Sequence, residues 1–438
     1  MNSFHRRRVR RLRRRLHVQT RRIWWPRWRR RVFFLAGGLA VGLCAIGMAI
    51  VADRAQVVFG QLRAAAPAAP FIVTPLGFAL AAYLTRAYFP SAGGSGIPQV
   101  IAAHRMDESS ARTALVSMRV AAGKVLLLIL GLLCGASAGR EGPTVQVGAS
   151  IMFGLGKLAR HREPGLLIAG SAAGIAAAFN APLAGIIFGI EEMSRSFETR
   201  TSGLILGTVI AAGLTSLAIL GDYTYFGTTA ETLPFGPQWI AVVVAGIVGG
   251  LGGGLFSRIL IEFGRGLPGA AGRLIRRRPV LFAALCGLAV ALCGYATGGS
   301  IFGTGYDQAK LILANNDSLP KSFGPLKLAS TALSSISGIP GGIFSPSLAV
   351  GAGLAQDLLP ILPHIPLAVL AILCMSAYLT GVVQAPMTSF VIVSEMTENH
   401  ALVIPIMICA LIANASSRLI CPEGVYHALS ENYHAAGH

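Results

Sequence analysis

Apolar runs long enough to cross a lipid bilayer recur along almost the whole chain, beginning with the run from Phe33 to Val51. The hydrocarbon core of a bilayer is about 30 Å thick, so one helical crossing needs roughly 20 apolar residues. Hydrophobic residues make up 53% of the 438 residues and charged residues only 13%, which excludes a globular protein with a water-exposed surface. The sequence therefore predicts an all-α, polytopic integral membrane protein.

The predicted helices differ in length, and several are too short to cross a bilayer alone. Because exposed backbone at membrane depth is tolerated only inside protein, we expect these short segments to be buried half-helices. The 53 glycines and 23 prolines agree with close helix packing and interrupted helices. The predicted segments are about 33–60, 71–88, 113–135, 144–157, 164–190, 202–220, 237–263, 279–297, 325–336, 346–359, 366–393 and 401–420.

Most of the formal net charge of +19 lies at the N-terminus, where residues 1–31 contain 14 arginines and no acidic residue. Arginine beside a first apolar span is typical of a cytoplasmic end, and Trp24, Trp25 and Trp28 suit the lipid headgroup layer. We therefore predict that residues 1–31 form a basic cytoplasmic tail that contacts lipid and not nucleic acid. No small-residue cleavage site follows the first apolar run, so this run is predicted to be a retained helix.

Two sequence patterns recur at nearly the same offset. The segment from Gly139 to Pro143 has a counterpart 203 residues later, and the segment that starts at Ala181 and reaches Glu191 has one 204 residues later. We predict two repeat halves, at about 32–220 and 237–430, within one membrane domain that ends in a short tail at 431–438. Repeats of this kind place a transport site between the halves near the bilayer midplane, whether they are inverted or parallel.

Each copy of the first pattern reads as a glycine-rich loop followed by a helix with proline in its first turn. The first amides of such a helix have no intrahelical acceptor, and the helix dipole places partial positive charge there. Two such helix starts that face each other bind an anion without a cationic side chain. A conducted ion is released more readily from dipoles and hydroxyls than from a full positive charge.

A third glycine-rich helix start runs from Gly94 to Pro98 and offers the hydroxyl of Ser95, which is either an anion ligand or an ordinary helix cap. Glu141 lies between two glycines at a predicted helix start. Its carboxylate can occupy the anion site and leave on protonation, or it can simply interact with the helix dipole. Acidic residues at membrane depth are functional candidates in general, and this class also includes Glu191, Glu192 and Glu395.

The ordered segments GSGIP at 94–98, GREGP at 139–143 and GIFSP at 342–346 resemble the signatures of the CLC chloride channels and transporters. The resemblance runs from about residue 33 to about 430 and includes APLAGIIFGIEEM, APMTSFVIVSEMT and Tyr426. It implies the CLC two-repeat fold with tilted and discontinuous helices. It also implies a homodimer with one pathway per subunit, in a bacterial inner membrane with both termini cytoplasmic.

The resemblance also implies roles for individual residues. A central anion would receive hydrogen bonds from the hydroxyls of Ser95 and Tyr426 and from backbone amides at Gly142, Ile343 and Phe344. Glu141 would be the external gating glutamate, which also carries protons. Basic residues that match positions beside the pore are Lys124 and Arg140, and Glu191 and Glu395 would have structural roles.

Glu192 matches the internal proton-carrying glutamate of the exchangers, at a position where channels usually have a non-acidic residue. The predicted function is therefore chloride/proton antiport, and the alternative is a passive voltage- or pH-gated chloride channel on the same fold. Ser95 resembles the chloride-selective type, whereas nitrate-preferring relatives tend to have proline there.

An enzyme is not expected. The G-x-S-G pattern that ends at Gly96 also occurs in rhomboid proteases, but the serine there needs a histidine base. The candidate histidines are predicted in loops or near helix ends: His161, His364, His400 and His427. The chain contains no Walker loop, no H-E-x-x-H and no cofactor fingerprint, and its seven cysteines lack metal-ligand spacing, so no metal or cofactor is predicted.

Overall fold

The computed structural model describes residues 3–106, 109–158, 165–194, 199–221, 225–316 and 318–434. Within these ranges it describes side chains from residue 31 onward, except those of residues 109, 199–202, 204, 271 and 434. This part of the chain is helical and contains no β-strand, only isolated bridges between loops. The predicted all-α fold is confirmed. The side chains of residues 1–30, nearly all of the predicted basic tail, lie outside the described part.

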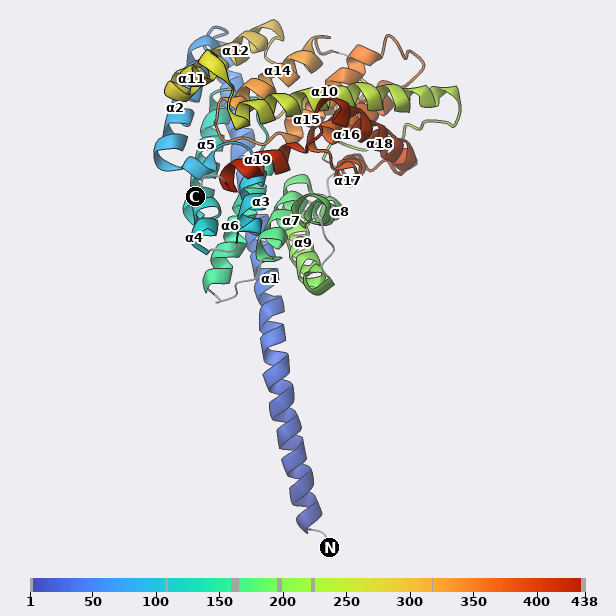
Figure 1. Ribbon diagram of the computed structural model, residues 1–438. Helices are drawn as coiled ribbons and strands as arrows, with labels where there is room; N and C mark the ends of the chain where they lie inside the picture. The colour runs from blue at the N-terminus through green and yellow to red at the C-terminus, as the bar shows by residue number, and fades with distance from the viewer. Residues whose placement is uncertain are drawn as a thin grey trace.

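The helices pack into one body, which α1 enters on the side of α6 and α9, and α10 lies across the opposite side (Figure 1). In chain order they are α1 (Ser3–Ala65), α2 (Pro70–Tyr88), η1 (Pro90–Ala92), α3 (Ile97–Arg105), α4 (Ser109–Leu115), α5 (Met118–Leu133), α6 (Glu141–Leu158), α7 (Gly165–Phe179), α8 (Pro182–Phe188), η2 (Gly189–Ser194), α9 (Thr199–Leu220), η3 (Pro237–Trp239), α10 (Ile240–Arg265), α11 (Gly269–Arg277), α12 (Pro279–Ala296), α13 (Tyr306–Leu313), α14 (Phe323–Ile336), α15 (Phe344–Leu358), α16 (Leu367–Val383), α17 (Pro386–Thr397), η4 (His400–Leu402), α18 (Val403–Ile420) and α19 (Val425–His434).

Several described helices are long and apolar enough to cross a bilayer, and their outward faces are apolar. Leu76, Leu285 and Leu411 are 65%, 56% and 60% exposed. Large exposed aliphatic side chains at this density suit a surface in contact with lipid. The segments that meet the length and hydropathy needed are Arg31–Ala65, Pro70–Tyr88, Ser110–Leu133, Pro237–Arg265, Pro279–Ala296 and His400–Ile420.

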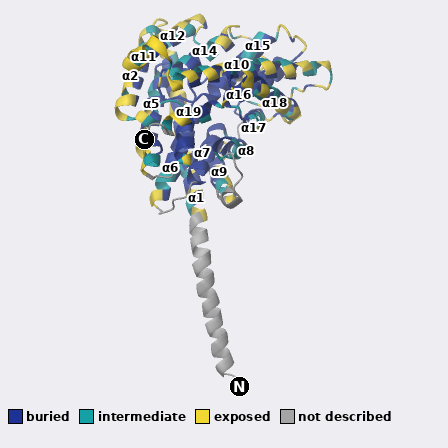
Figure 2. Cartoon of the chain, in the orientation of Figure 1, coloured by how far each residue is buried: buried dark blue, intermediate teal, exposed yellow. Residues whose placement is uncertain are grey.

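Two apolar helices, α7 and α16, form the centre of the body, and every residue of both is buried (Figure 2). A helix that is apolar on all sides belongs in the interior. Glycine and alanine in α7 allow the backbones of neighbouring helices to approach closely. A Cβ added to Gly170 would lie only 2.3 Å from the carbonyl oxygen of Gly148 in α6.

The prediction of one continuous helix at 164–190 and another at 366–393 is wrong, because each segment forms two helices. Asn180 and Gln384 have left-handed backbone angles, with φ of 52° and 56°. Proline follows two residues later, at Pro182 and Pro386, and begins a new helix. Proline disfavours helical angles in the residue before it, so the chain cannot continue as one helix. The result is a pair of short helices, α8 and α17, that start inside the protein.

The short helices α8 and α17 exchange equivalent contacts between the two halves. The carboxylate of Glu191, just after α8, accepts hydrogen bonds from two amides in the first turn of α17, at 3.1 and 2.6 Å. The carboxylate of Glu395, in α17, accepts two from the first turn of α8, at 3.0 and 2.6 Å. Each glutamate therefore satisfies helix-start amides of the other half.

The pair α2 and α12 gives the relative direction of the halves, since each is the second long helix of its half. Phe71 at the start of α2 contacts Tyr295 at the end of α12, with ring centroids 5.8 Å apart. The position of a Cβ on Gly287, in the middle of α12, lies 2.8 Å from the carbonyl oxygen of Thr74. These helices run in opposite directions, as expected for inverted halves.

Replacing Glu395 with alanine is expected to destabilise the protein by about 2–3 kcal/mol, because two helix-start amides lose a charged acceptor. Glu395→Gln should cost less, since its side chain keeps one acceptor oxygen. Thermal unfolding in detergent measures both effects, with the exposed Glu262→Ala as control. Equal melting temperatures for the three variants would contradict a stabilising role of this contact.

Candidate functional site

The three glycine-rich loops meet through backbone hydrogen bonds. The amide of Gly94 donates to the carbonyl of Ile339 at 3.2 Å, and the amide of Gly341 donates to the carbonyl of Gly94 at 3.1 Å. Gly139 and Gly342 exchange two hydrogen bonds, both 2.7 Å. The starts of α3, α6 and α15 consequently converge on one buried point, where the partial positive charges of their first turns add.

The carboxylate of Glu141, the first residue of α6, occupies this point. Its side chain is fully buried, and Oε1 accepts a hydrogen bond of 2.6 Å from the hydroxyl of Ser345, in the first turn of α15. Oε2 makes no hydrogen bond to any residue in the described ranges. It lies only 2.5 Å from the position of a Cβ on Gly139, so a side chain there would displace the carboxylate. A negative group is thus held between two helix starts.

Ser95 and Gly142 face each other beside this carboxylate. The Ser95 hydroxyl lies 2.8 Å from the position of a Cβ on Gly142, so only glycine leaves this space open. The hydroxyl is no firm helix cap, because Gly96 is the cap residue of α3 and the contact from the Ile97 amide to Ser95 Oγ is 3.5 Å. Its hydrogen-bonding capacity therefore remains largely available to a ligand.

Phe344 and Tyr426 extend the site toward α19. Their rings are stacked, with centroids 5.9 Å apart, and Phe344 also contacts Phe179 and Phe188 edge-on. The Tyr426 hydroxyl is buried, and the hydroxyl of Ser95 is its polar neighbour. The structure thus brings Tyr426 and Ser95 close to the start of α15.

Ile343 is the cap residue of α15, and no side chain caps this helix. Both Ile343 and Phe344 are buried. As in any helix, the amides of the first turn lack intrahelical acceptors. The predicted set of Ser95, Tyr426, Ile343, Phe344, Gly142 and Glu141 is therefore gathered at one place.

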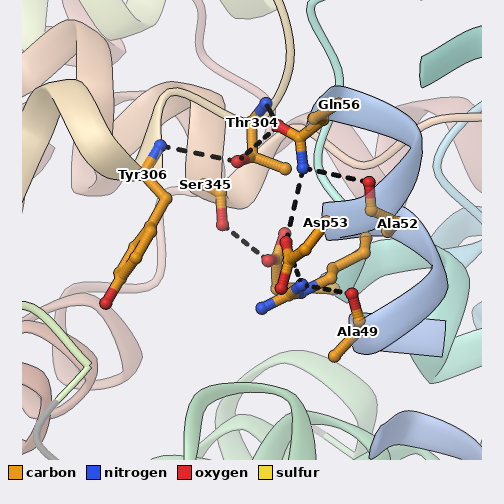
Figure 3. A network of polar contacts seen from close by, with 9 residues as sticks. Ala49, Ala52, Asp53, Gln56, Thr304, Tyr306 and Ser345 are labelled. Atoms are coloured by element: carbon orange, nitrogen blue, oxygen red, sulfur yellow. Dashed lines mark hydrogen bonds and ion pairs between the residues drawn. The ribbon is translucent and has the colours of Figure 1, made fainter. Parts of the chain in front are cut away.

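Arg140 points away from this point, toward α1. Its guanidinium Nη1 donates to the carbonyl of Ala49 at 2.9 Å and forms an ion pair of 2.6 Å with Asp53 Oδ1. One turn further along α1, Gln56 Oε1 accepts hydrogen bonds from Thr304, at 2.8 Å from its amide and 3.1 Å from its hydroxyl (Figure 3). Asp53 and Gln56 line a pocket of about 460 Å³ on this side of the site, the outer pocket.

Lys124 is fully buried and stabilises the loop that carries Ser95. Its ammonium donates to the carbonyls of Gly93 and Gly94, at 3.2 and 2.9 Å. It thus lies behind the loop, where it orients the backbone.

Glu192 lies in the short π-helical segment η2, apart from the three glycine-rich loops. It is buried, and Oε1 is 3.5 Å from Nε2 of His427 in α19. It borders a second pocket, of about 530 Å³, that also reaches Arg105 and Gln384, the inner pocket. Glu192 therefore borders the inner pocket, whereas Glu141 is fully buried at the helix starts.

The comparison with known protein families agrees with this arrangement. The profile described as "Voltage gated chloride channel" matches residues 77–418, most of the chain. The chain belongs to the voltage-gated chloride channel family. The matched range contains all three glycine-rich loops, both short helices α8 and α17, and both acidic residues.

Solved structures of the voltage-gated chloride channel family share the fold. A slow cyanobacterial Cl⁻/H⁺ antiporter has a TM-score of 0.79 and 25% identity, covering 92% of this chain and 97% of that one. A CLC-type fluoride/proton antiporter has 0.78 and 22%, covering 92% and 98%. A eukaryotic CLC transporter has 0.73 and 20%, covering 92% and 74%. The last two, below 25% identity, support the fold alone.

Two residues near the site were not predicted from the sequence of this voltage-gated chloride channel family member, Lys327 and His427. Lys327 is fully buried and donates to the carbonyls of Ile301 and Gly303, both at 2.8 Å. It follows Lys124 by 203 residues, the repeat offset, so comparing the halves would have found it. His427, considered only as a protease base, contacts Glu192.

Proposed function

We propose that the protein exchanges chloride for protons across the membrane. The observation that carries this proposal is the buried carboxylate of Glu141 between the starts of α6 and α15. The helix starts bind negative charge, and the Glu141 carboxylate already occupies them. Chloride can enter only when this carboxylate leaves. A carboxylate leaves such a site most easily after it takes up a proton, so the two ions exchange places.

In this proposal the chloride ligands are the hydroxyls of Ser95 and Tyr426 and amides at the start of α15. The support is their common position, with the Tyr426 and Ser95 hydroxyls next to each other and the Ile97 amide 3.5 Å from Ser95 Oγ. Hydroxyl and amide donors bind an anion without a full positive charge, which favours release. We propose chloride as the substrate because Ser95 resembles the chloride-selective type.

Glu192 carries protons between the inner pocket and the centre of the protein in this proposal. It is a buried acid at membrane depth, and such groups in membrane proteins mark ion or proton routes. The likeness to a cyanobacterial Cl⁻/H⁺ antiporter at 25% identity supports exchange over passive conduction. Arg140 and Lys124 act on the site from outside it, by fixing the backbone around Glu141 and Ser95.

We propose that the inner pocket faces the cytoplasm. Asp53 lies 22 residues after Arg31 in α1, about 33 Å along the axis, so the outer pocket is one bilayer away from the basic end. Helix α6 runs back from Asp53 toward that end, where Lys157 lies. Basic residues collect on the cytoplasmic side, so both termini are proposed to be cytoplasmic in a bacterial inner membrane. The resemblance also supports a homodimer with one pathway per subunit.

Replacing Glu192 with glutamine tests the proton route. Proton uptake driven by a chloride gradient into proteoliposomes is expected to fall at least about tenfold, because the amide cannot carry a proton. Chloride flux should continue, since Glu192 lies in η2 beside the inner pocket and not in the three glycine-rich loops. The exposed Glu262→Gln is the matched control. Undiminished proton uptake by Glu192→Gln would contradict the proposed route.

A further inference from the structure

His427 links Glu192 to a basic residue in the inner pocket. Its Nε2 lies 3.5 Å from Glu192 Oε1, and its Nδ1 lies 2.9 Å from Nη2 of Arg105. The side chains of His427 and Glu192 are 11% and 5% exposed, whereas Arg105 is exposed. The three side chains thus form a chain of contacts from the open pocket to a buried acid.

The contact with Arg105 determines how the imidazole is protonated. A guanidinium has only donors, so the hydrogen bond requires His427 Nδ1 to be the acceptor. In the neutral ring the proton is then on Nε2, which faces Glu192. Arg105 therefore orients an N–H bond of His427 toward the carboxylate.

The groups around this contact come from several elements. Arg105 is in α3, and Glu191 and Glu192 are in η2. Arg418 is in α18, Glu423 follows that helix, and His427 and Glu431 are in α19. Arg265 forms ion pairs with Glu423 and Glu431, which reduces their negative charge near the pocket. The ionisable residues that line the inner pocket are Arg105, Glu191, Glu192, Arg418, Glu423, His427 and Glu431.

We propose that His427 relays protons between the inner pocket and Glu192, and that Arg105 is a positioning residue that sets the tautomer. This inference rests on the proposed exchange of chloride for protons. When Arg105 moves aside, a hydronium ion of the pocket gives a proton to Nδ1. The Nε2–H bond breaks, its proton forms an O–H bond on the ionised Glu192, and the imidazole is again neutral. The starting tautomer returns when water of the pocket takes the proton from Nδ1 and a hydronium ion gives one to Nε2, with no net change in protons.

A purely structural role for His427 predicts different behaviour. In that case glutamine, which keeps a donor of similar reach, would preserve the contact with Glu192 and with it the transport of protons. A relay instead needs a group that accepts one proton while it gives up another, which an amide cannot do. The ratio of proton flux to chloride flux therefore distinguishes the two roles.

The test uses the full-length chain in proteoliposomes, with proton and chloride fluxes measured together under a chloride gradient. For His427→Gln we expect proton flux per chloride to fall about tenfold, with chloride flux retained as proof of folding. His427→Ala should behave alike, and added imidazole should restore part of its proton flux. The exposed His364→Gln is the matched control.

Arg105→Gln tests the positioning role. Glutamine carries no positive charge and is shorter than arginine, so the imidazole becomes easier to protonate. We therefore expect the pH dependence of proton flux to move upward by about one pH unit. An unchanged pH profile would overturn the positioning role of Arg105.

The outcomes separate this inference from the proposed function. Wild-type exchange with an unchanged proton-to-chloride ratio in His427→Gln would overturn the relay and leave the proposed function standing. Chloride flux without proton movement in the wild type would overturn the proposed function, and the relay with it.

Discussion

Glu141→Gln is expected to reduce chloride-driven proton uptake to the level of protein-free vesicles while chloride exchange continues. The amide fills the same volume between α6 and α15 but carries neither a charge nor a transferable proton. Because the introduced amide does not titrate, its competition with chloride for the site should be independent of pH. Proton and chloride fluxes measured in the same proteoliposomes over a range of pH test both parts of this expectation.

The exposed Glu398→Gln is the control, because it removes the same charge away from the helix starts. It should leave both fluxes at wild-type values. If Glu141→Gln still moved protons at the wild-type rate, Glu141 could not be the group that exchanges places with chloride.

Gly142→Ala is expected to reduce chloride exchange by about tenfold or more. The added Cβ would lie 2.8 Å from the Ser95 hydroxyl and 2.9 Å from its carbonyl oxygen. The surrounding loops are tied by the paired hydrogen bonds of Gly139 and Gly342, so they cannot shift easily. Overpacking of this kind costs about 1–3 kcal/mol, enough to change a rate tenfold when it falls on the transport path.

Gly154→Ala is the matched control in the same helix. The nearest atoms to its added Cβ belong to the flexible side chain of Met118, at 3.6 Å, so transport should stay at the wild-type rate. Initial rates are compared for protein that elutes as a single folded species. A wild-type rate for Gly142→Ala would show that the space between Ser95 and Gly142 is not on the chloride path.

The helix starts of the site could be predicted because their signals are local. Glycine before Glu141 and proline after it specify a loop and a first turn within five residues, and the second copy ending at Pro346 repeats the signal. Once two such starts are predicted in a membrane interior, an anion site between them follows from the helix dipoles.

The break at Asn180 was missed because both sides of it are apolar, and hydropathy alone cannot separate one buried helix from two. Pro182 was the available signal. The partner of Arg140 was missed for another reason, since Asp53 is 87 residues away and no local pattern joins them. The contact of His427 with Arg105 spans 322 residues and likewise depends on the folded arrangement.

Coupled exchange is tested most directly with the wild-type protein in vesicles loaded with high chloride and diluted into low chloride, with the membrane potential clamped by a potassium ionophore. We expect chloride efflux to drive protons inward against an opposing proton gradient, and a proton ionophore to collapse the acidification. Chloride efflux at the same rate without any acidification of the vesicle interior would contradict coupled exchange, and would make the protein a passive chloride channel.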